Sequence, residues 1–299
     1  MIRRIWDEGM TGKSQVATLA QVLADSIGPR LSGTPGFLAA TDWVASRYRA
    51  WGIAVRKEQY GTWRGWKRHY THVDLIAPRE RTLDAMLLAW SPGTTRPVEG
   101  AVVVIPELAD SAAARAWLPN VKGKFVLLSA PEPTCRPDEN WERLARPATV
   151  ATMKASRDSL KRTWNQRAQR LGRDAFAVLE AGGAAGVLTS LWSGGWGVNK
   201  IFSANTRTVP VLDVSCEDYG LLHRLAANGQ GPRLRLDARS EQTADAPMFN
   251  VVGELKGSEK PDEYILLSAH LDSWDGASGA TDNGTGTVMM MEAMRLLKA

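Results

Sequence analysis

Apolar residues recur at helical spacing near the start of the chain. Over residues 14–28 the repeat predicts a helix that ends where Gly28 meets Pro29. A second repeat over residues 37–51 predicts another helix, closed by Gly52. Two short strands are expected next, at 53–60 and at 71–78, and the second stops at Pro78 because proline cannot donate to a strand ladder.

The middle of the chain has short β-branched runs separated by turns. These runs predict strands at 85–90, 100–106, 123–129, 185–190 and 208–215, with helices at 110–117 and 160–181. A stretch rich in glycine and tryptophan, 191–208, predicts a long loop. The pattern indicates a compact α/β insert at 79–247, flanked by two segments of one domain at 1–78 and 248–299.

The last fifty residues return to long apolar runs. Residues 249–257 predict a strand, and residues 263–273 a second one, whose continuous run YILL is typical of a buried parallel strand. A final helix is expected over 282–299. In doubly wound sheets ligands gather at the carboxyl ends of strands, which is where His270 and Asp272 are expected to lie.

Composition narrows the class of protein. A chain of 299 residues with 44% hydrophobic and 23% charged residues excludes general disorder. No apolar run is long enough for a membrane span, and no signal peptide is visible. The net charge of +5 comes mostly from a basic run at 154–173, interpreted as a solvated helix face and not as a nucleic-acid site. Cys135 and Cys216 form no CxxC motif, which leaves one disulfide open.

The strongest chemical signal is HLDSWDGASGATDNGTG, residues 270–286. Histidine is a common metal ligand, and a neighbouring carboxylate such as Asp272 can fix its tautomer. Asp282 opens a helix, and its two oxygens could bridge two divalent cations. The competing interpretation is structural: an aspartate before a helix is also an ordinary N-cap, and a histidine at a strand end is often merely hydrogen-bonded.

The combination of HLDS with GATDNGTG resembles the co-catalytic zinc peptidases, the family of bacterial leucyl aminopeptidases and plasma glutamate carboxypeptidase (carboxypeptidase Q). IGPRLSGTPG near the start resembles the family's N-terminal signature. VKGKFVLLS, EAGGAAGVLTS and TVPVLDVSCEDYGLLHRLAANG are similar to elements of a protease-associated domain. The resemblance implies an α/β fold: a doubly wound zinc-exopeptidase sheet, incomplete at the C-terminus, with an inserted protease-associated domain.

The resemblance also implies a role for each matching residue. His270 would bind one of two Zn²⁺ ions, Asp272 would orient His270, and Asp282 would bridge both ions, joined to Asn283 by a cis peptide. Zinc-activated water would then hydrolyse a terminal amide bond of a peptide or dipeptide. The family further implies export to the periplasm or the extracellular space, and it is compatible with a homodimer.

The sequence departs from the family pattern in one respect. The family's general base, a glutamate, and its remaining ligands lie beyond the helix that Asp282 opens, and no such residues follow here. The other histidines, His69, His72 and His223, all lie upstream and outside the pattern. We therefore expect the N-terminal part of a longer enzyme, inactive as a 299-residue chain.

Two further questions stay open on the sequence alone. The competing function is a non-catalytic, receptor-like or interaction homologue of the same fold. Trp274, Trp192 and Trp196 are candidates for pocket walls, although hydrophobic packing is the favoured interpretation.

Overall fold

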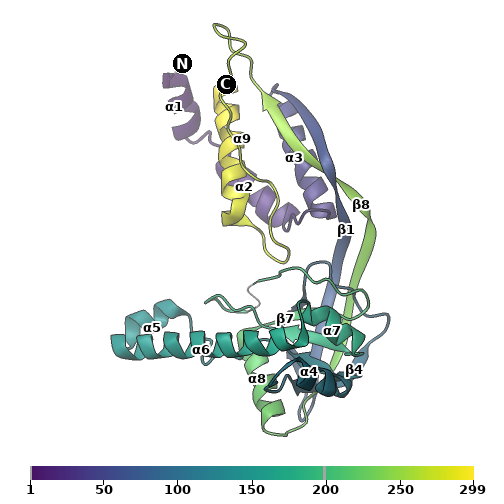
Figure 1. Cartoon of the computed structure of the whole chain (residues 1–299). Helices are drawn as coiled ribbons and strands as arrows, with labels where there is room; N and C mark the ends of the chain where they lie inside the picture. Colours follow the sequence, from purple (N-terminus) through teal and green to yellow (C-terminus); the bar gives the residue numbers. More distant parts are fainter. Residues whose placement is uncertain (1, 198–199) are drawn as a thin grey trace. The chain divides into compact units, whose positions relative to one another are not determined.

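The computed structural model describes residues 2–197 and 200–299 and shows a mixed α/β protein (Figure 1). The chain divides into two compact units, described separately below. Unit 1 comprises Met1–Lys67 and Gln242–Ala299, and unit 2 comprises Arg68–Glu241. The long strands β1, Ala54–Ala77, and β8, Arg233–Glu254, contribute residues to both units. The expected insert had its limits at residues 79 and 247.

Unit 1 is built mainly from helices. It contains α1 (Ile2–Met10), α2 (Val16–Gln21), which continues as the π-helical turn η1 (Val22–Ile27), and α3 (Pro35–Ala50). The two helices expected at 14–28 and 37–51 are confirmed. Thr34 caps α3 by accepting the Phe37 N–H, and proline at the first helical position needs no hydrogen-bond partner.

The C-terminal helix α9, Thr285–Lys298, completes the core of unit 1. It lies beside α1 and α2 in Figure 1, and its apolar face packs on α2, η1 and α3. The buried core comprises Leu19, Leu23, Ala40, Val44, Tyr48, Ile53, Val288 and Met291. This periodic apolar face explains why the helices form where the sequence pattern placed them.

The strand expected at 263–273 is wrong. Residues 263–274 adopt no regular structure, and Ile265 is 92% exposed. Its neighbours Tyr264 and Leu266 are also largely exposed. A buried parallel strand needs hydrogen-bonded neighbours on both sides, and the described residues provide none for this segment.

Exposure of this segment leads to a direct prediction. Ile265→Asp should change the free energy of unfolding of the 299-residue chain by less than about 0.5 kcal/mol, because a solvated side chain loses no packing. Val288→Asp, which buries a carboxylate in the unit 1 core, should unfold unit 1. Thermal unfolding of the two variants measures the difference. A large loss for Ile265→Asp would show that the segment is packed.

Unit 2 contains the sheet, with strand order β2-β1-β8-β4-β5-β6-β7-β3. Its other strands are β2 (Arg81–Leu83), β3 (Ala85–Leu87), β4 (Val98–Val104), β5 (Phe125–Leu127), β6 (Gly186–Thr189) and β7 (Val211–Val214). β4 to β7 run parallel, while β3, β8 and β2 pair antiparallel to their neighbours. Every residue of β5, β6 and β7 is buried, which explains their continuous apolar sequences.

Five α-helices accompany this sheet: α4 (Ser111–Trp117), α5 (Asp138–Leu144), α6 (Pro147–Leu171), α7 (Ala175–Ala181) and α8 (Cys216–Ala227). A 3₁₀ turn, η2 (Leu118–Val121), extends α4. The single helix expected at 160–181 is wrong, because α6 begins earlier and ends at Gly172, whose φ of +134° a helix cannot contain. Asp174 then caps α7 by accepting the Ala177 N–H.

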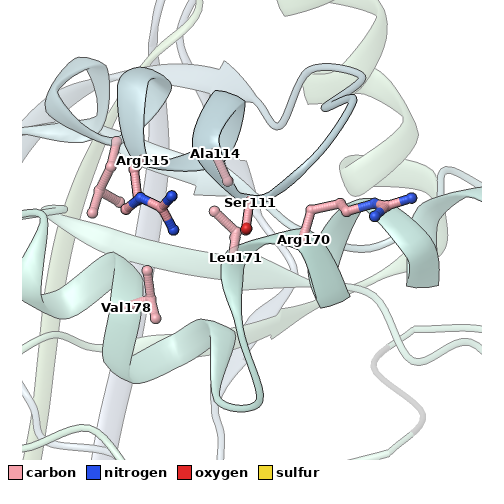
Figure 2. Close-up of a pocket in the computed structure, with 7 residues that line it drawn as sticks. Ser111, Ala114, Arg115, Arg170, Leu171 and Val178 are labelled. Atoms are coloured by element: carbon pink, nitrogen blue, oxygen red, sulfur yellow. The ribbon is translucent and has the colours of Figure 1, made fainter.

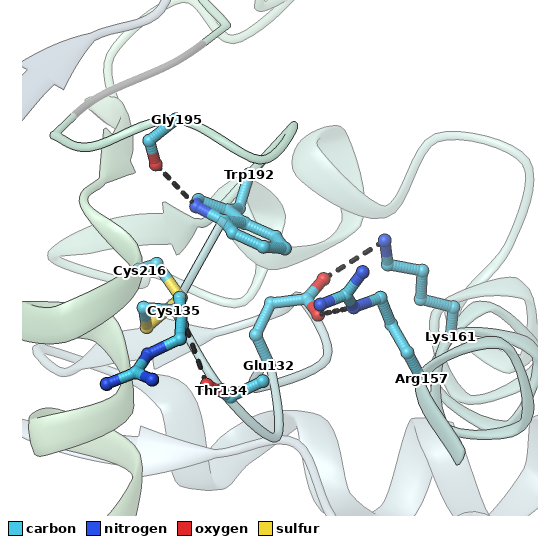
Figure 3. Close-up of a disulfide and its surroundings, with 9 residues drawn as sticks. Glu132, Thr134, Cys135, Arg157, Lys161, Trp192, Gly195 and Cys216 are labelled. Atoms are coloured by element: carbon cyan, nitrogen blue, oxygen red, sulfur yellow. Dashed lines mark hydrogen bonds and ion pairs between the residues drawn. A yellow bond between two sulfur atoms is a disulfide. The ribbon is translucent and has the colours of Figure 1, made fainter. Parts of the chain in front are cut away.

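A disulfide joins Cys135 to Cys216 at the start of α8 (Figure 3). Beside it, the Glu132 carboxylate lies between Arg157, at 2.8 Å, and Lys161, at 3.0 Å. The Arg157 guanidinium also stacks on the ring of Trp192. These contacts attach the segment before α5 to α6 and α8. The loop expected at 191–208 includes residues 198 and 199, which lie outside the described residues.

In the part of the chain that the structure describes, none of the helices combines the length and apolar character that membrane crossing requires.

Candidate metal site

His270, Asp272 and Asp282 lie together in unit 1. Nδ1 of His270 is 3.0 Å from Oδ1 of Asp272, and Nε2 of the same ring is 2.9 Å from Oδ1 of Asp282. All three side chains are open to solvent, with Asp282 the most exposed at 71%. These are the three candidate residues of the motif at 270–286, and the structure brings them into contact.

The main chain around Asp282 fixes its position relative to His270. Asp282 lies in the turn η3, Ala280–Gly284, where the backbone at Asp282 and Asn283 is not helical, and this turn leads directly into α9. The Asp282–Asn283 peptide bond is cis, as the resemblance implied. The Thr287 hydroxyl, on the first turns of α9, donates to the main-chain carbonyl of His270 at 3.1 Å. The start of α9 therefore fixes the positions of both His270 and Asp282.

Arg30 organises the segment that carries His270 and Asp272. Its side chain is fully buried, and its guanidinium faces five main-chain carbonyls. Nε donates to Leu271 at 2.9 Å, and the two terminal nitrogens donate to Ser278 at 2.7 Å and Gly279 at 3.0 Å. The remaining bonds go to Leu23 and Gly28. The planar guanidinium of Arg30 thus hydrogen-bonds to both the start and the end of the loop at residues 271–279.

Two serines tie the same loop to the N-terminal turn. The main-chain N–H of Arg30 donates to the Ser273 hydroxyl at 3.0 Å, and the Ser273 N–H donates to the Arg30 carbonyl at 3.2 Å. The Ser32 hydroxyl donates to Oδ2 of Asp272 at 3.2 Å. The sequence alone predicts no role for Arg30 or Ser32, although both belong to the motif IGPRLSGTPG.

Burial and charge act on the ionisable groups near Asp272. Burial lowers the pKa of Arg30, and the nearby negative charge of Asp272 partly offsets this shift. The phenol of Tyr60, on β1, has its pKa raised by burial and also by the charge of Asp272. Tyr60 is thus within electrostatic range of the site while remaining 61% exposed.

The donor types fit a zinc site, but the described residues supply only part of one. Imidazole nitrogen and carboxylate oxygen are ligands that zinc takes, and Nε2 of His270 faces Oδ1 of Asp282 with no intervening residue. Asp272 uses its oxygens on His270 and Ser32. Within residues 2–197 and 200–299, no three His, Cys, Asp or Glu side chains are arranged to hold a metal ion by themselves.

The other histidines make contacts of a structural kind within unit 2. His69 faces Glu241 at 3.5 Å, and His72 contacts Asp74 at 3.0 Å. His223 packs edge-on against the ring of Trp164, and burial lowers its pKa.

The tryptophans differ in their surroundings. Trp192 is buried against Arg157, and its indole N–H donates to the Gly195 carbonyl at 2.6 Å, which is a packing role (Figure 3). Trp196 and Trp274 are both exposed, at 67% and 49%. Trp274 lies two residues from Asp272 and remains a candidate for substrate contact.

A small cavity in unit 2 lies between α4, α6 and α7 (Figure 2). Its volume is about 50 Å³, which is room for very few water molecules and not for a peptide. It has no acidic or histidine side chain in its lining, which consists of Ser111, Ala114, Arg115, Leu118, Arg170, Leu171 and Val178. It is therefore a packing defect beside α6 and not a second metal site.

The α/β fold, in which unit 2 interrupts the sequence of unit 1, agrees with the fold that the resemblance implied. The comparisons confirm the resemblance: residues 250–299 match the profile of peptidase family M28. Carboxypeptidase Q from Bos taurus is 26% identical over 291 residues, which span 96% of this chain and 56% of that protein. This chain is therefore similar to M28 peptidases over residues 250–299 and to carboxypeptidase Q over most of its length.

Solved structures agree on the fold. A peptidase M28 precursor from Shewanella amazonensis SB2B has a TM-score of 0.63 at 20% identity, covering 99% of this chain and 62% of the other. A zinc aminopeptidase from Bacillus subtilis has a TM-score of 0.53 at 20% identity, covering 95% of this chain and 57% of the other. The chain spans little more than half the length of the curated relatives it matches.

Proposed function

We propose that these 299 residues form part of a two-zinc exopeptidase that removes residues from a peptide or dipeptide. The observation that carries this proposal is the contact of His270 with Asp272 on one ring nitrogen and with Asp282 on the other. The M28 match over residues 250–299 supports it, because that match includes all three residues.

Each residue has a distinct role in this proposal. Nε2 of His270 would hold one zinc ion, and the carboxylate of Asp282 would hold both. With its proton on Nδ1, His270 would donate to Asp272, which would leave the lone pair of Nε2 for the metal and fix the plane of the ring. When bound, zinc supplies a Lewis acid for the scissile carbonyl and a source of hydroxide at neutral pH.

The donors missing from the described residues belong to the same proposal. A zinc ion in a catalytic site takes three protein ligands, whereas His270 and Asp282 supply two donors in all. The curated relatives are considerably longer than this chain. We infer that the remaining ligands and the general base come from outside these 299 residues. Residues 79–247 would form a protease-associated insert between the two peptidase segments.

The disulfide bears on the compartment. Disulfides persist in oxidising environments and are rare in the cytosol. The pairing of Cys135 with Cys216 therefore favours export, to the periplasm or outside the cell.

The proposal is tested on the product of the complete reading frame that encodes these residues. It should hydrolyse dipeptide substrates, lose activity on chelation and regain it with Zn²⁺. Asp282→Ala should lower kcat/KM on the order of a thousandfold or more, because metal ions supply several kcal/mol of transition-state stabilisation. The matched control is Asp262→Ala, which removes an exposed aspartate from the segment between β8 and η3.

Two results would contradict the proposal. Activity that survives both chelation and Asp282→Ala would remove zinc from the mechanism. A folded, complete product with no hydrolytic activity on any peptide would favour the non-catalytic homologue instead.

A further inference from the structure

We propose that Ser32 is a positioning residue of the metal site: its hydroxyl holds the Asp272 carboxylate, which in turn holds the ring of His270. The inference rests on the proposed function for its consequence, metal binding, and on three consecutive contacts for its geometry. Ser32 donates to Oδ2 of Asp272 at 3.2 Å, and Oδ1 of the same carboxylate lies 3.0 Å from Nδ1 of His270. The far nitrogen of that ring faces Asp282 at 2.9 Å.

Asp272 needs this support because it is itself exposed. Its side chain is 45% open to solvent, and a carboxylate bound through one oxygen can rotate about its last torsion. A second hydrogen bond on the other oxygen fixes the plane of the carboxylate. The plane of the carboxylate then fixes which way the imidazole ring faces.

The turn that carries Ser32 is rigid. The Thr34 N–H and its hydroxyl both donate to the Leu31 carbonyl, at 3.1 and 2.6 Å, which closes the turn around Ser32. Gly33 has a φ of +82°, and a Cβ at this position would lie 2.4 Å from the carbonyl oxygen of Arg64. The Gly33 carbonyl also accepts the Trp66 N–H at 3.2 Å. The turn is therefore pressed against β1, and the Ser32 hydroxyl is held before any metal binds.

Arg30, two residues before Ser32, helps to hold Asp272 in place through the main chain. Arg30 anchors the main chain at Leu271 and exchanges two hydrogen bonds with Ser273, so the residues flanking Asp272 are fixed to the N-terminal turn. The Ser32–Asp272 bond adds a side-chain contact between this turn and the donor set. Arg30 holds the backbone of the loop, and Ser32 holds the carboxylate.

The test uses the 299-residue chain labelled with ¹⁵N-histidine. The chain has four histidines, so each ring gives separate signals, and His270→Ala identifies those of His270. Zn²⁺ alone is titrated, and the concentration that shifts the Nε2 signal of His270 halfway is recorded. Ser32→Ala should raise this concentration about two- to tenfold, the value of one ordinary hydrogen bond. Asp272→Ala should raise it by roughly ten- to a hundredfold.

Controls separate positioning from folding. Ser46→Ala removes a serine hydroxyl from α3 whose bond goes to the Trp43 carbonyl, and it should leave the zinc response unchanged. Ser32→Thr retains a hydroxyl and should restore the response. The Nδ1 signal of His270 should change in Ser32→Ala without any metal, while the midpoint of thermal unfolding stays within about one degree of the parent chain.

The outcomes of this experiment are distinct. A Ser32→Ala chain with the zinc response and the Nδ1 signal of the parent would overturn the positioning role. If zinc moves no His270 signal in the parent chain, the two donors present do not bind the ion by themselves, and the zinc-dependent activity of the complete product decides the proposed function. The Nδ1 signal without metal then decides alone whether Ser32 positions Asp272.

Discussion

Arg30→Met is expected to lower the free energy of unfolding of unit 1 by about 3 kcal/mol or more. The substitution retains an unbranched apolar chain of similar length and removes only the guanidinium. Five main-chain carbonyls would lose the guanidinium as a donor. Those of Leu23 and Gly279 would keep a second donor, the N–H groups of Gly28 and Gly284, so the loss falls mainly on the carbonyls of Gly28, Leu271 and Ser278. Leaving buried acceptors without partners costs more than a hydrogen bond gains.

Regional hydrogen exchange measures this effect, because the two units need not unfold together. Peptides from α3 and α9 should exchange faster in Arg30→Met, whereas peptides from β5 and β6 should exchange as in the parent chain. Arg49→Met makes the same substitution at an exposed position on α3 and should have no such effect. Equal protection in the two variants would show that the Arg30 contacts do not stabilise the unit.

Removing the disulfide is expected to have the second large effect, confined to unit 2. Cys135 and Cys216 close a loop of 81 residues, for which chain entropy predicts a stabilisation of about 4.5 kcal/mol, within a usual range of roughly 2–5. The double variant Cys135→Ser, Cys216→Ser should therefore lose protection in α8 and in the segment before α5. Reduction of the parent chain should have the same result.

Unit 1 is the internal control for this experiment, because both cysteines of the chain lie in unit 2. Its helices should keep their protection in the double variant. The prediction fails if the oxidised parent chain reacts as two free thiols, or if the double variant loses less than about 1 kcal/mol in unit 2.

Local pattern was sufficient for α2, α3 and α9 of unit 1, although it did not predict α1, and it failed where structure depends on distant partners. The helix at 37–51 formed as expected, because its cap, its apolar face and its closing glycine are all close in sequence. The run YILL has the composition of a buried strand, yet burial requires neighbouring strands that composition does not provide. Gly172 is the opposite case. It is a local signal for a helix end, and the single helix predicted at 160–181 did not take it into account.

The candidate site likewise has a part that the local sequence predicts and a part that it does not. His270, Asp272 and Asp282 fall within thirteen consecutive residues, so spacing and resemblance could bring them together. Arg30 and Ser32 contact the same loop from about 240 residues away in sequence. Nothing in their own neighbourhood distinguishes a buried arginine that binds carbonyls from a surface arginine in a loop. The quoted motif IGPRLSGTPG was the only signal that could have indicated them.

The central claim is that His270 and Asp282 hold zinc in the protein to which these residues belong. The most direct measurement is the zinc content, per molecule, of the purified product of the complete reading frame, with and without His270→Ala. The account predicts about two zinc ions in the parent protein and at least one fewer in the variant. Equal zinc in both proteins, or none in the parent, would contradict it.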